Sequence, residues 1–117
     1  MWVRRPAKLT AAQIVAKLEQ DFDDACMKAV RAGEKEGYSA SVFLEMRTRH
    51  GGREAARRLM HGRQVPYGFR KLAQMGRLDL TIEAIVHDNP RFQSLFPQKT
   101  LDYCTARLAA VGYKVKA

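Results

Sequence analysis

The chain has few cysteines, and none is placed for a disulfide framework or a metal site. Its 117 residues include two, Cys26 and Cys104. Neither belongs to a C-x-x-C pair or to a Cys/His cluster with the spacing of metal ligands. Both fall on the apolar faces of predicted helices, so we expect two buried free thiols, no metal ion and no cofactor.

Long apolar runs are also missing. No segment approaches the roughly eighteen consecutive apolar residues that a membrane span needs. The N-terminal sequence MWVRRPAKLT carries basic residues, but neither an apolar core nor a small-residue cleavage site follows it, as a secretory signal would require. We therefore expect a soluble, cytoplasmic protein without a membrane partner.

Motifs of catalysis are scarce. His50 and His61 are separated by two glycines and a predicted helix, so they lack the i,i+4 spacing that places two imidazoles on one metal. The segment HGGREAARR lacks the lysine and serine or threonine that complete a phosphate-binding loop. Asp79 and Glu83 could be paired carboxylates for acid–base or magnesium chemistry, but their spacing is that of a helix cap and a first-turn acid, which favours a structural role. The sequence predicts that the protein is not an enzyme.

Acidic residues are nearly absent from one basic segment. The chain has 21 Lys and Arg against 12 Asp and Glu, a net charge of +9. Residues 47–77 hold nine basic residues and one acid, Glu54, so their local excess of eight nearly equals that of the whole chain. Such a balance favours nucleic acid or an acidic protein surface as partner. The nine basic residues, which we call the arginine cluster, are Arg47, Arg49, Arg53, Arg57, Arg58, Arg63, Arg70, Lys71 and Arg77.

Helical periodicity runs through the chain. Apolar residues recur every three or four positions, caps or glycines bound each segment, and no alternating strand pattern of any length stands beside them. We predict an all-α protein: a single compact domain over residues 1–117, with six or seven helices in an irregular orthogonal bundle, a flexible arm at 1–9 and a tail at 113–117. The predicted helices run from a cap at Thr10 to Gly33, from a cap at Ser39 or Ser41 to Gly51, and over about 53–60, 67–75, 80–87 and 99–111, with a brief turn at Asn89 and Pro90.

One long segment resembles a known kind of module. GGREAARRLMHGRQVPYGFRKLAQMGRLDLTIEAIV, with the later LF, ARL and GY, is similar to an all-helical module of poorly characterised bacterial and phage proteins. The resemblance covers about residues 42–113. It implies an all-helical fold in a bacterial or phage setting, and it assigns no functional residue.

We interpret the arginine cluster first as a nucleic-acid surface. Arginine outnumbers lysine in it by eight to one, and arginines at helix ends contact phosphates. His61, Tyr67 and Phe69 could stack on bases. The connection HGRQVPYG is longer than the turn of a helix-turn-helix, so that motif is not favoured.

Two other functions stay open. Arginine is also common at protein interfaces, so the chain could be a phage or mobile-element protein that binds an acidic surface of a host protein or nucleic-acid enzyme and inhibits or regulates it, as anti-defence proteins do. It could also be a structural domain of a larger nuclease or defence protein, with arginines that only keep it soluble. The sequence leaves the oligomeric state open.

Overall fold

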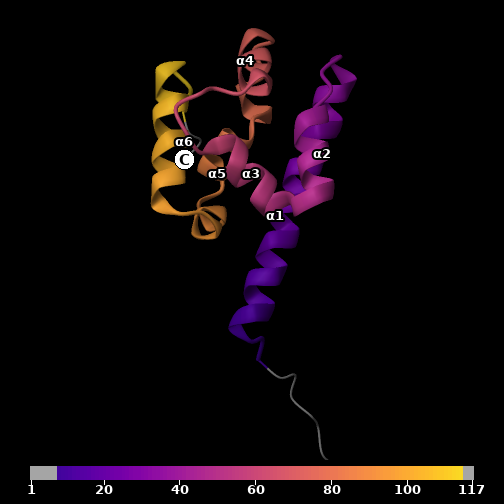
Figure 1. Ribbon diagram of the computed structural model, residues 1–117, viewed down its shortest axis with the longest axis vertical. Helices are drawn as coiled ribbons and strands as arrows, with labels where there is room; N and C mark the ends of the chain where they lie inside the picture. Colours follow the sequence, from indigo (N-terminus) through magenta and orange to yellow (C-terminus); the bar gives the residue numbers. More distant parts are fainter. Residues whose placement is uncertain (1–7, 115–117) are drawn as a thin grey trace, which may run out of the picture.

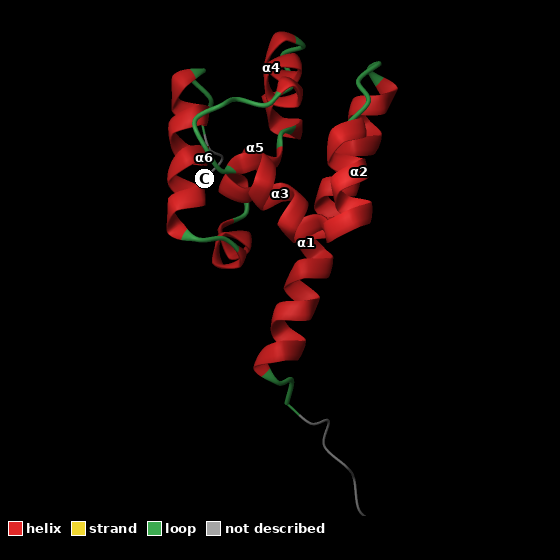
Figure 2. Cartoon of the chain, viewed as in Figure 1, coloured by secondary structure: helices red, strands yellow, loops and turns green. Residues whose placement is uncertain are grey.

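A computed structural model describes residues 8–114 as helices joined by short connections (Figures 1 and 2). Over this range there is no strand, and the all-α prediction is confirmed. The predicted arm at 1–9 and tail at 113–117 fall largely outside the described residues. The elements are α1 (Ala11–Lys35), α2 (Ser41–His50), α3 (Gly52–Met60), α4 (Tyr67–Gln74), the 3-10 helix η1 (Leu78–Leu80), α5 (Ile82–Asp88), the 3-10 helix η2 (Pro90–Leu95) and α6 (Gln98–Ala110).

The first helix begins where the sequence predicts and ends later. The Thr10 hydroxyl accepts a hydrogen bond from the Gln13 amide at 3.1 Å, and the Gln13 side chain accepts one from the Thr10 amide at 2.8 Å, which makes a capping box. The predicted stop at Gly33 is wrong, because α1 continues to Lys35 and the chain turns at Gly37, whose φ is +88°. Gly33 instead leaves room for the ring of Tyr38, to which an added Cβ would come within 3.3 Å.

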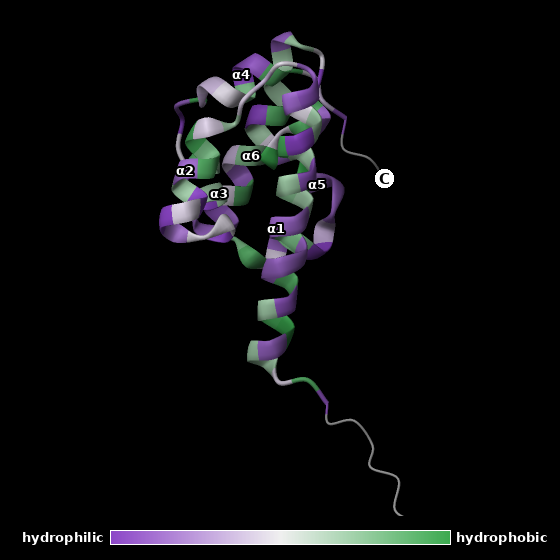
Figure 3. Cartoon of the chain, turned by 90° about the vertical axis from the view of Figure 1, so that its right-hand side faces the viewer, coloured by the Kyte–Doolittle hydropathy of each residue, from purple (hydrophilic) through white to green (hydrophobic). Residues whose placement is uncertain are grey.

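Only the C-terminal part of α1 enters the core. Phe22 and Cys26 are buried, whereas Ile14 and Val15, which belong to the same predicted apolar face, are 54% and 40% exposed. The first turns of α1 project from the body formed by the other helices (Figures 1 and 3). The periodicity therefore identified the right face of the helix, but neighbouring elements cover only half of its length.

Aromatic rings and small residues build the centre of the core. The Phe22 ring meets Phe92 and Phe96 of the η2 region edge to face, with ring centroids 5.4 and 5.3 Å apart. Such pairs each add about 0.5–1.5 kcal/mol beyond their buried area. Ala55 and Ala56 of α3 are fully buried, and their small side chains let α3 cross close to α1.

Two predicted helix caps are wrong. Thr81, and not Asp79, caps α5, and its hydroxyl accepts a hydrogen bond from the Ala84 amide at 3.1 Å. Asp79 lies too early because η1 occupies Leu78–Leu80 ahead of the helix. Similarly, α2 has Ala40 at its N-cap position and no side-chain cap, so neither Ser39 nor Ser41 fills that role.

None of the helices described here combines the length and the apolar character needed to cross a bilayer.

Candidate binding surface

Acids from distant parts of the sequence meet the arginine cluster. Arg47 on α2 donates two hydrogen bonds to the Asp23 carboxylate on α1, at 2.7 and 2.6 Å, and hydrogen bonding to Asp23 is the main cause that raises the pKa of Arg47. Arg53 on α3 lies 3.5 Å from Glu19 of α1 and donates its Nε–H to the Leu95 carbonyl at 2.8 Å. These two arginines join helices within the domain.

Other members of the cluster pair with acids on their own helices. Arg49 lies 2.9 Å from Glu45, and Arg57 and Arg58 share the Glu54 carboxylate, which is 3.9 Å from Arg58. The hydrogen bond from Arg57 lowers the pKa of Glu54. All these pairs are at least partly exposed, and pairs of that kind add little stability.

Arg77 completes the set by joining the end of α1 to η1. Its guanidinium contacts Glu36 and donates to both oxygens of Asp79 at 3.1 Å. Six of the nine basic side chains thus pair with six acids, and nine minus six leaves an excess of three where the sequence segment shows eight. The six acids are Glu19, Asp23, Glu36, Glu45, Glu54 and Asp79.

Three members of the cluster have no ion-pair partner among residues 8–114. Arg63 and Arg70 are exposed and Lys71 is half-buried. Arg63 belongs to the α3–α4 connection, whereas Arg70 and Lys71 lie on α4. Free positive charge from the cluster is therefore confined to α4 and the loop before it.

The polar hollow beside Arg53 holds two carboxylates together with Arg47 and Arg53, the two arginines that pair with them. The carboxylates of Glu19 and Asp23 line it together with Gly52 at the start of α3. A Cβ on Gly52 would clash with the Asp23 carboxylate, so this carboxylate lies against the helix N-terminus that could otherwise attract a phosphate. The hollow does not suit an anion.

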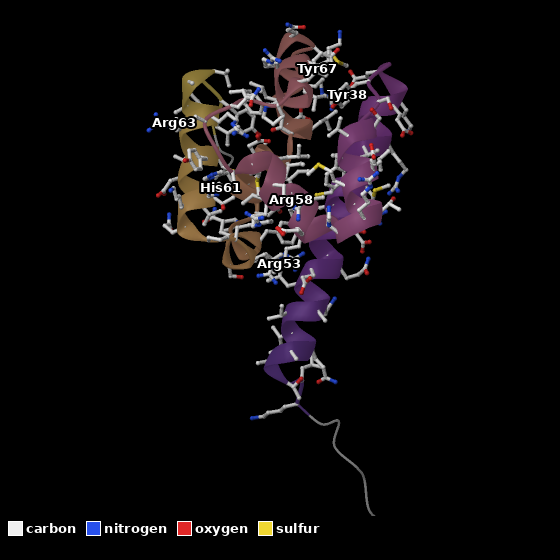
Figure 4. The ribbon with its side chains drawn as sticks, viewed as in Figure 1. Tyr38, Arg53, Arg58, His61, Arg63 and Tyr67 are labelled. Carbon is white, nitrogen blue, oxygen red and sulfur yellow. The ribbon has the colours of Figure 1, made fainter. Side chains whose placement is uncertain are left out.

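The three predicted stacking residues differ in availability. The His61 Nδ1 atom is 2.9 Å from the Thr100 hydroxyl, and its ring meets Tyr103 edge to face at 5.0 Å. Phe69 is 5% exposed and packs in the core, whereas Tyr67 is 66% exposed at the start of α4 (Figure 4). Of these three predicted stacking residues, Tyr67 is the one whose ring is largely exposed to solvent.

Tyr67 stands at the mouth of an apolar pocket of about 170 Å³. We call this cavity the Tyr67 pocket. Val42 and Tyr67 line it but are 61% and 66% exposed, so they form its rim. The walls come from the C-terminal half of α1, the start of α2 with the connection before it, α4 and the η1–α5 region. They include Ala29, Tyr38, Phe43, Phe69, Leu72, Leu80 and Ile82.

Two glycines position Tyr38 in the wall of the pocket. Its ring lies against Gly33 of α1, and its hydroxyl lies so close to Gly68 of α4 that a Cβ there would clash with it. Tyr38 and Tyr67 are near each other in the space between α4 and the α1–α2 pair (Figure 4). Burial, followed by the proximity of Tyr67, raises the pKa of Tyr38.

A buried ion pair lies behind this pocket. The side chains of Arg107 on α6 and Glu83 on α5 are 4% and 5% exposed, with 2.7 Å between Nη1 and Oε2. Arg107 also donates to the carbonyls of Leu59, Gly62 and Gln64 at 3.0, 2.8 and 3.3 Å, which fixes the α3–α4 connection. Burial raises the pKa of the Glu83 carboxyl, and the hydrogen bond from Arg107 opposes that shift.

One signal in the sequence points to this pair. Arg107 lies between Cys104 and Leu108, on the apolar face of its helix, where a charged residue needs a partner. Glu83 was correctly placed in the first turn of its helix, but its burial was not foreseen. The prediction of buried free thiols at Cys26 and Cys104 is confirmed.

Over the described residues, no group of three or more His, Cys, Asp or Glu side chains is placed to hold a metal ion. Comparisons of the chain with protein families, curated proteins and solved structures find no match.

Proposed function

We propose that the chain is a small, non-catalytic binding module whose partner is an acidic polypeptide segment. The observation that carries this proposal is an apolar pocket whose rim residue Tyr67 shares an outward helix face with two cations that have no ion-pair partner among the described residues. Phe69 and Leu72 turn one face of α4 into the core, so Tyr67, Arg70 and Lys71, at i, i+3 and i+4, share the opposite face. An apolar site beside a few cations suits a segment that is both apolar and acidic.

The pairing within the arginine cluster weighs against nucleic acid as the first choice. A phosphate backbone approaching Arg47 or Arg53 would also approach the carboxylates of Asp23 and Glu19. A base in the Tyr67 pocket would bury polar edges against an almost wholly apolar lining, which is unfavourable without hydrogen bonds.

Nucleic-acid association remains the second candidate. The chain as a whole keeps its net charge of +9, and such a charge draws a protein toward any polyanion. In that case the contacts fall to Arg63, Arg70 and Lys71, with the open ring of Tyr67 as the stacking surface.

A module without catalytic groups acts by covering a surface. In the bacterial or phage setting that the resemblance implies, the chain would inhibit or regulate its partner in the cytoplasm by occupying an acidic site on it. The partner could be a nucleic-acid enzyme, whose own substrate is acidic.

The test compares two double variants that remove the same charge. Arg70→Gln with Lys71→Gln alters the α4 surface, and Lys28→Gln with Lys99→Gln is the matched control on exposed positions of α1 and α6. The probes are a fluorescent acidic octapeptide with a central tryptophan, and duplex DNA, single-stranded DNA and RNA with the same label, over a salt series. We expect the peptide to bind native protein best, and the α4 variant to weaken it at least fivefold while the control changes it less than twofold. Tighter binding of the nucleic acids, with equal losses in both variants, would contradict the proposal.

A further inference from the structure

We infer that the Tyr67 pocket receives one uncharged aromatic side chain, which anchors the acidic segment. This inference rests on the proposed function and names the chemistry of the residue at the centre of the partner segment.

The size of the pocket fits one ring. Its volume of about 170 Å³ is close to that of a protein cavity of about 150 Å³ that holds benzene. The walls and rim offer the rings of Tyr38, Phe43, Tyr67 and Phe69. Aromatic pairs have favourable edge-to-face and offset geometries, so these walls favour an aromatic guest over an aliphatic one.

The lining excludes a charged guest. Its one acidic member is Glu83, which already holds Arg107 at 2.7 Å. Within the described residues no buried side-chain nitrogen or oxygen lacks a hydrogen-bond partner, and the other oxygen-bearing side chains of the lining carry only neutral hydroxyls, at Tyr38, Ser39, Ser41, Tyr67 and Thr81. A charged group would lose its hydration here and gain no compensation.

The rim indicates that the ring comes from a polypeptide. A free aromatic molecule would fill the pocket and leave Val42 and Tyr67 in water, at 61% and 66% exposure. Residues on both sides of an anchoring side chain would cover them, as the rim of an interface covers the residue that contributes most of its affinity. One turn beyond Tyr67, the cations Arg70 and Lys71 match acidic residues that flank the anchor.

The pocket is already formed in the free chain. Gly33 and Gly68 leave the space that Tyr38 occupies, and the ring of Tyr38 forms part of the wall. A preformed site loses little conformational freedom on binding, which favours a short segment as partner.

The experiment varies the anchor and the pocket separately. Three acidic octapeptides differ only in their central residue, which is tryptophan, phenylalanine or serine. Ala29→Phe places a ring in the pocket from the half-buried wall of α1, and Val42→Glu places an acid on the exposed rim, where folding is not at risk. Indole alone serves as a probe of the cavity by its effect on the melting temperature.

On native protein we expect the two aromatic peptides to bind at least tenfold more tightly than the serine peptide. Ala29→Phe should abolish that difference, and Val42→Glu should reduce the affinity of the aromatic peptides. Indole should raise the melting temperature of native protein and not that of Ala29→Phe.

Other outcomes separate this inference from the proposed function. Equal binding of all three peptides, still weakened by the Arg70→Gln and Lys71→Gln changes, would overturn the anchor and leave the function in place. An aromatic advantage that persists in both pocket variants would also overturn the anchor. Stabilisation by indole without binding of any peptide would overturn both, and would make the pocket a site for a free aromatic molecule.

Discussion

At the scale of single residues, the Glu83–Arg107 pair is the most demanding feature of the interior. Two opposite charges lie 2.7 Å apart with almost no exposure, and Arg107 also donates to the Leu59 carbonyl at the end of α3 and to two carbonyls of the α3–α4 connection. Removing one partner of such a pair leaves the other charge buried without compensation. The pair therefore holds together α5, α6 and the loop that leads to the candidate surface.

This predicts unequal effects of two substitutions. Glu83→Gln should lower the free energy of unfolding by about 3 kcal/mol, and Arg107→Met by about 5 kcal/mol, because the latter also frees three carbonyl groups. Urea denaturation followed by circular dichroism measures both. Losses below about 1 kcal/mol, the range of surface pairs, would show that the pair is not buried in solution.

A second residue prediction concerns the contact of Tyr38 with Gly68. Alanine normally stabilises a helix relative to glycine by about 1 kcal/mol. Here we expect Gly68→Ala to destabilise the chain by about 1–3 kcal/mol, because the new Cβ clashes with the Tyr38 hydroxyl.

Tyr38→Phe provides the control for that prediction, because it removes the hydroxyl and keeps the ring. In the Tyr38→Phe background, Gly68→Ala should be neutral or stabilising. A double-mutant cycle of unfolding free energies measures the coupling, and an identical effect of Gly68→Ala in both backgrounds would refute the contact.

The sequence could not give the partners of the arginine cluster. A pair four residues apart on one helix can be read from the sequence, and Lys17 lies 3.5 Å from Asp21. Asp24 likewise accepts a hydrogen bond from Gln20, four residues before it, at 2.8 Å. Asp23, Glu19 and Glu36 lie 24, 34 and 41 residues from Arg47, Arg53 and Arg77, and only the crossing of helices brings them together.

At the scale of helices, local sequence signals predict where most helices begin and end. They do not predict which part of an apolar helix face is covered by other helices. The cap at Thr10 and the helix end at Gly51 depend on neighbouring residues alone, and both lie where the sequence predicts them. Whether an apolar face is buried depends on other elements. The predicted stripe of α1 is therefore correct at Phe22 and exposed at Ile14.

The uneven coverage of α1 predicts uneven protection of its amides. The amide hydrogens of residues 14–18 should exchange with low protection, through local fraying of the helix, because isolated helical turns are marginally stable in water. Residues 24–30 should exchange only on global unfolding. Hydrogen exchange followed by NMR measures this, and global protection of the first turns would mean that another surface covers Ile14 and Val15 in solution.

At the scale of the whole molecule, most acidic side chains form ion pairs with basic side chains of the same chain. The net charge is therefore not concentrated in the arginine cluster. Of the 12 acids in the sequence, six pair with arginines of that cluster. Charge spread in this way raises the rate of encounter with any polyanion. It gives little preference for one partner, which is why the candidate site depends on the Tyr67 pocket. The sequence pattern could not reveal that pocket, because its walls come from four separate segments.

Stability should also fall steeply in alkali, because two thiols are buried. Desolvation is the main cause that raises the pKa of Cys26 above its usual range and the pKa of Cys104 to about 12. An unfolded thiol has a pKa of about 8.5. Above that value the unfolded chain releases protons that the folded chain keeps, so the stability present at neutral pH is lost as pH rises toward the folded pKa values. Each thiol should approach a slope of about 1.4 kcal/mol per pH unit.

The slope of the unfolding free energy against pH, between pH 9 and 10, distinguishes the contribution of the two thiols from that of other titrating groups. Replacing Cys26 or Cys104 with alanine lowers the stability at every pH by leaving a small cavity, but that offset does not change with pH. In each single variant the fall of the unfolding free energy with pH should therefore be less steep by about 1.4 kcal/mol per pH unit, and in the double variant by about twice as much. Urea denaturation at a series of pH values gives these slopes. A double variant as sensitive to alkali as the native chain would show that the thiols ionise in the folded state, and hence that Cys26 and Cys104 are not in the core.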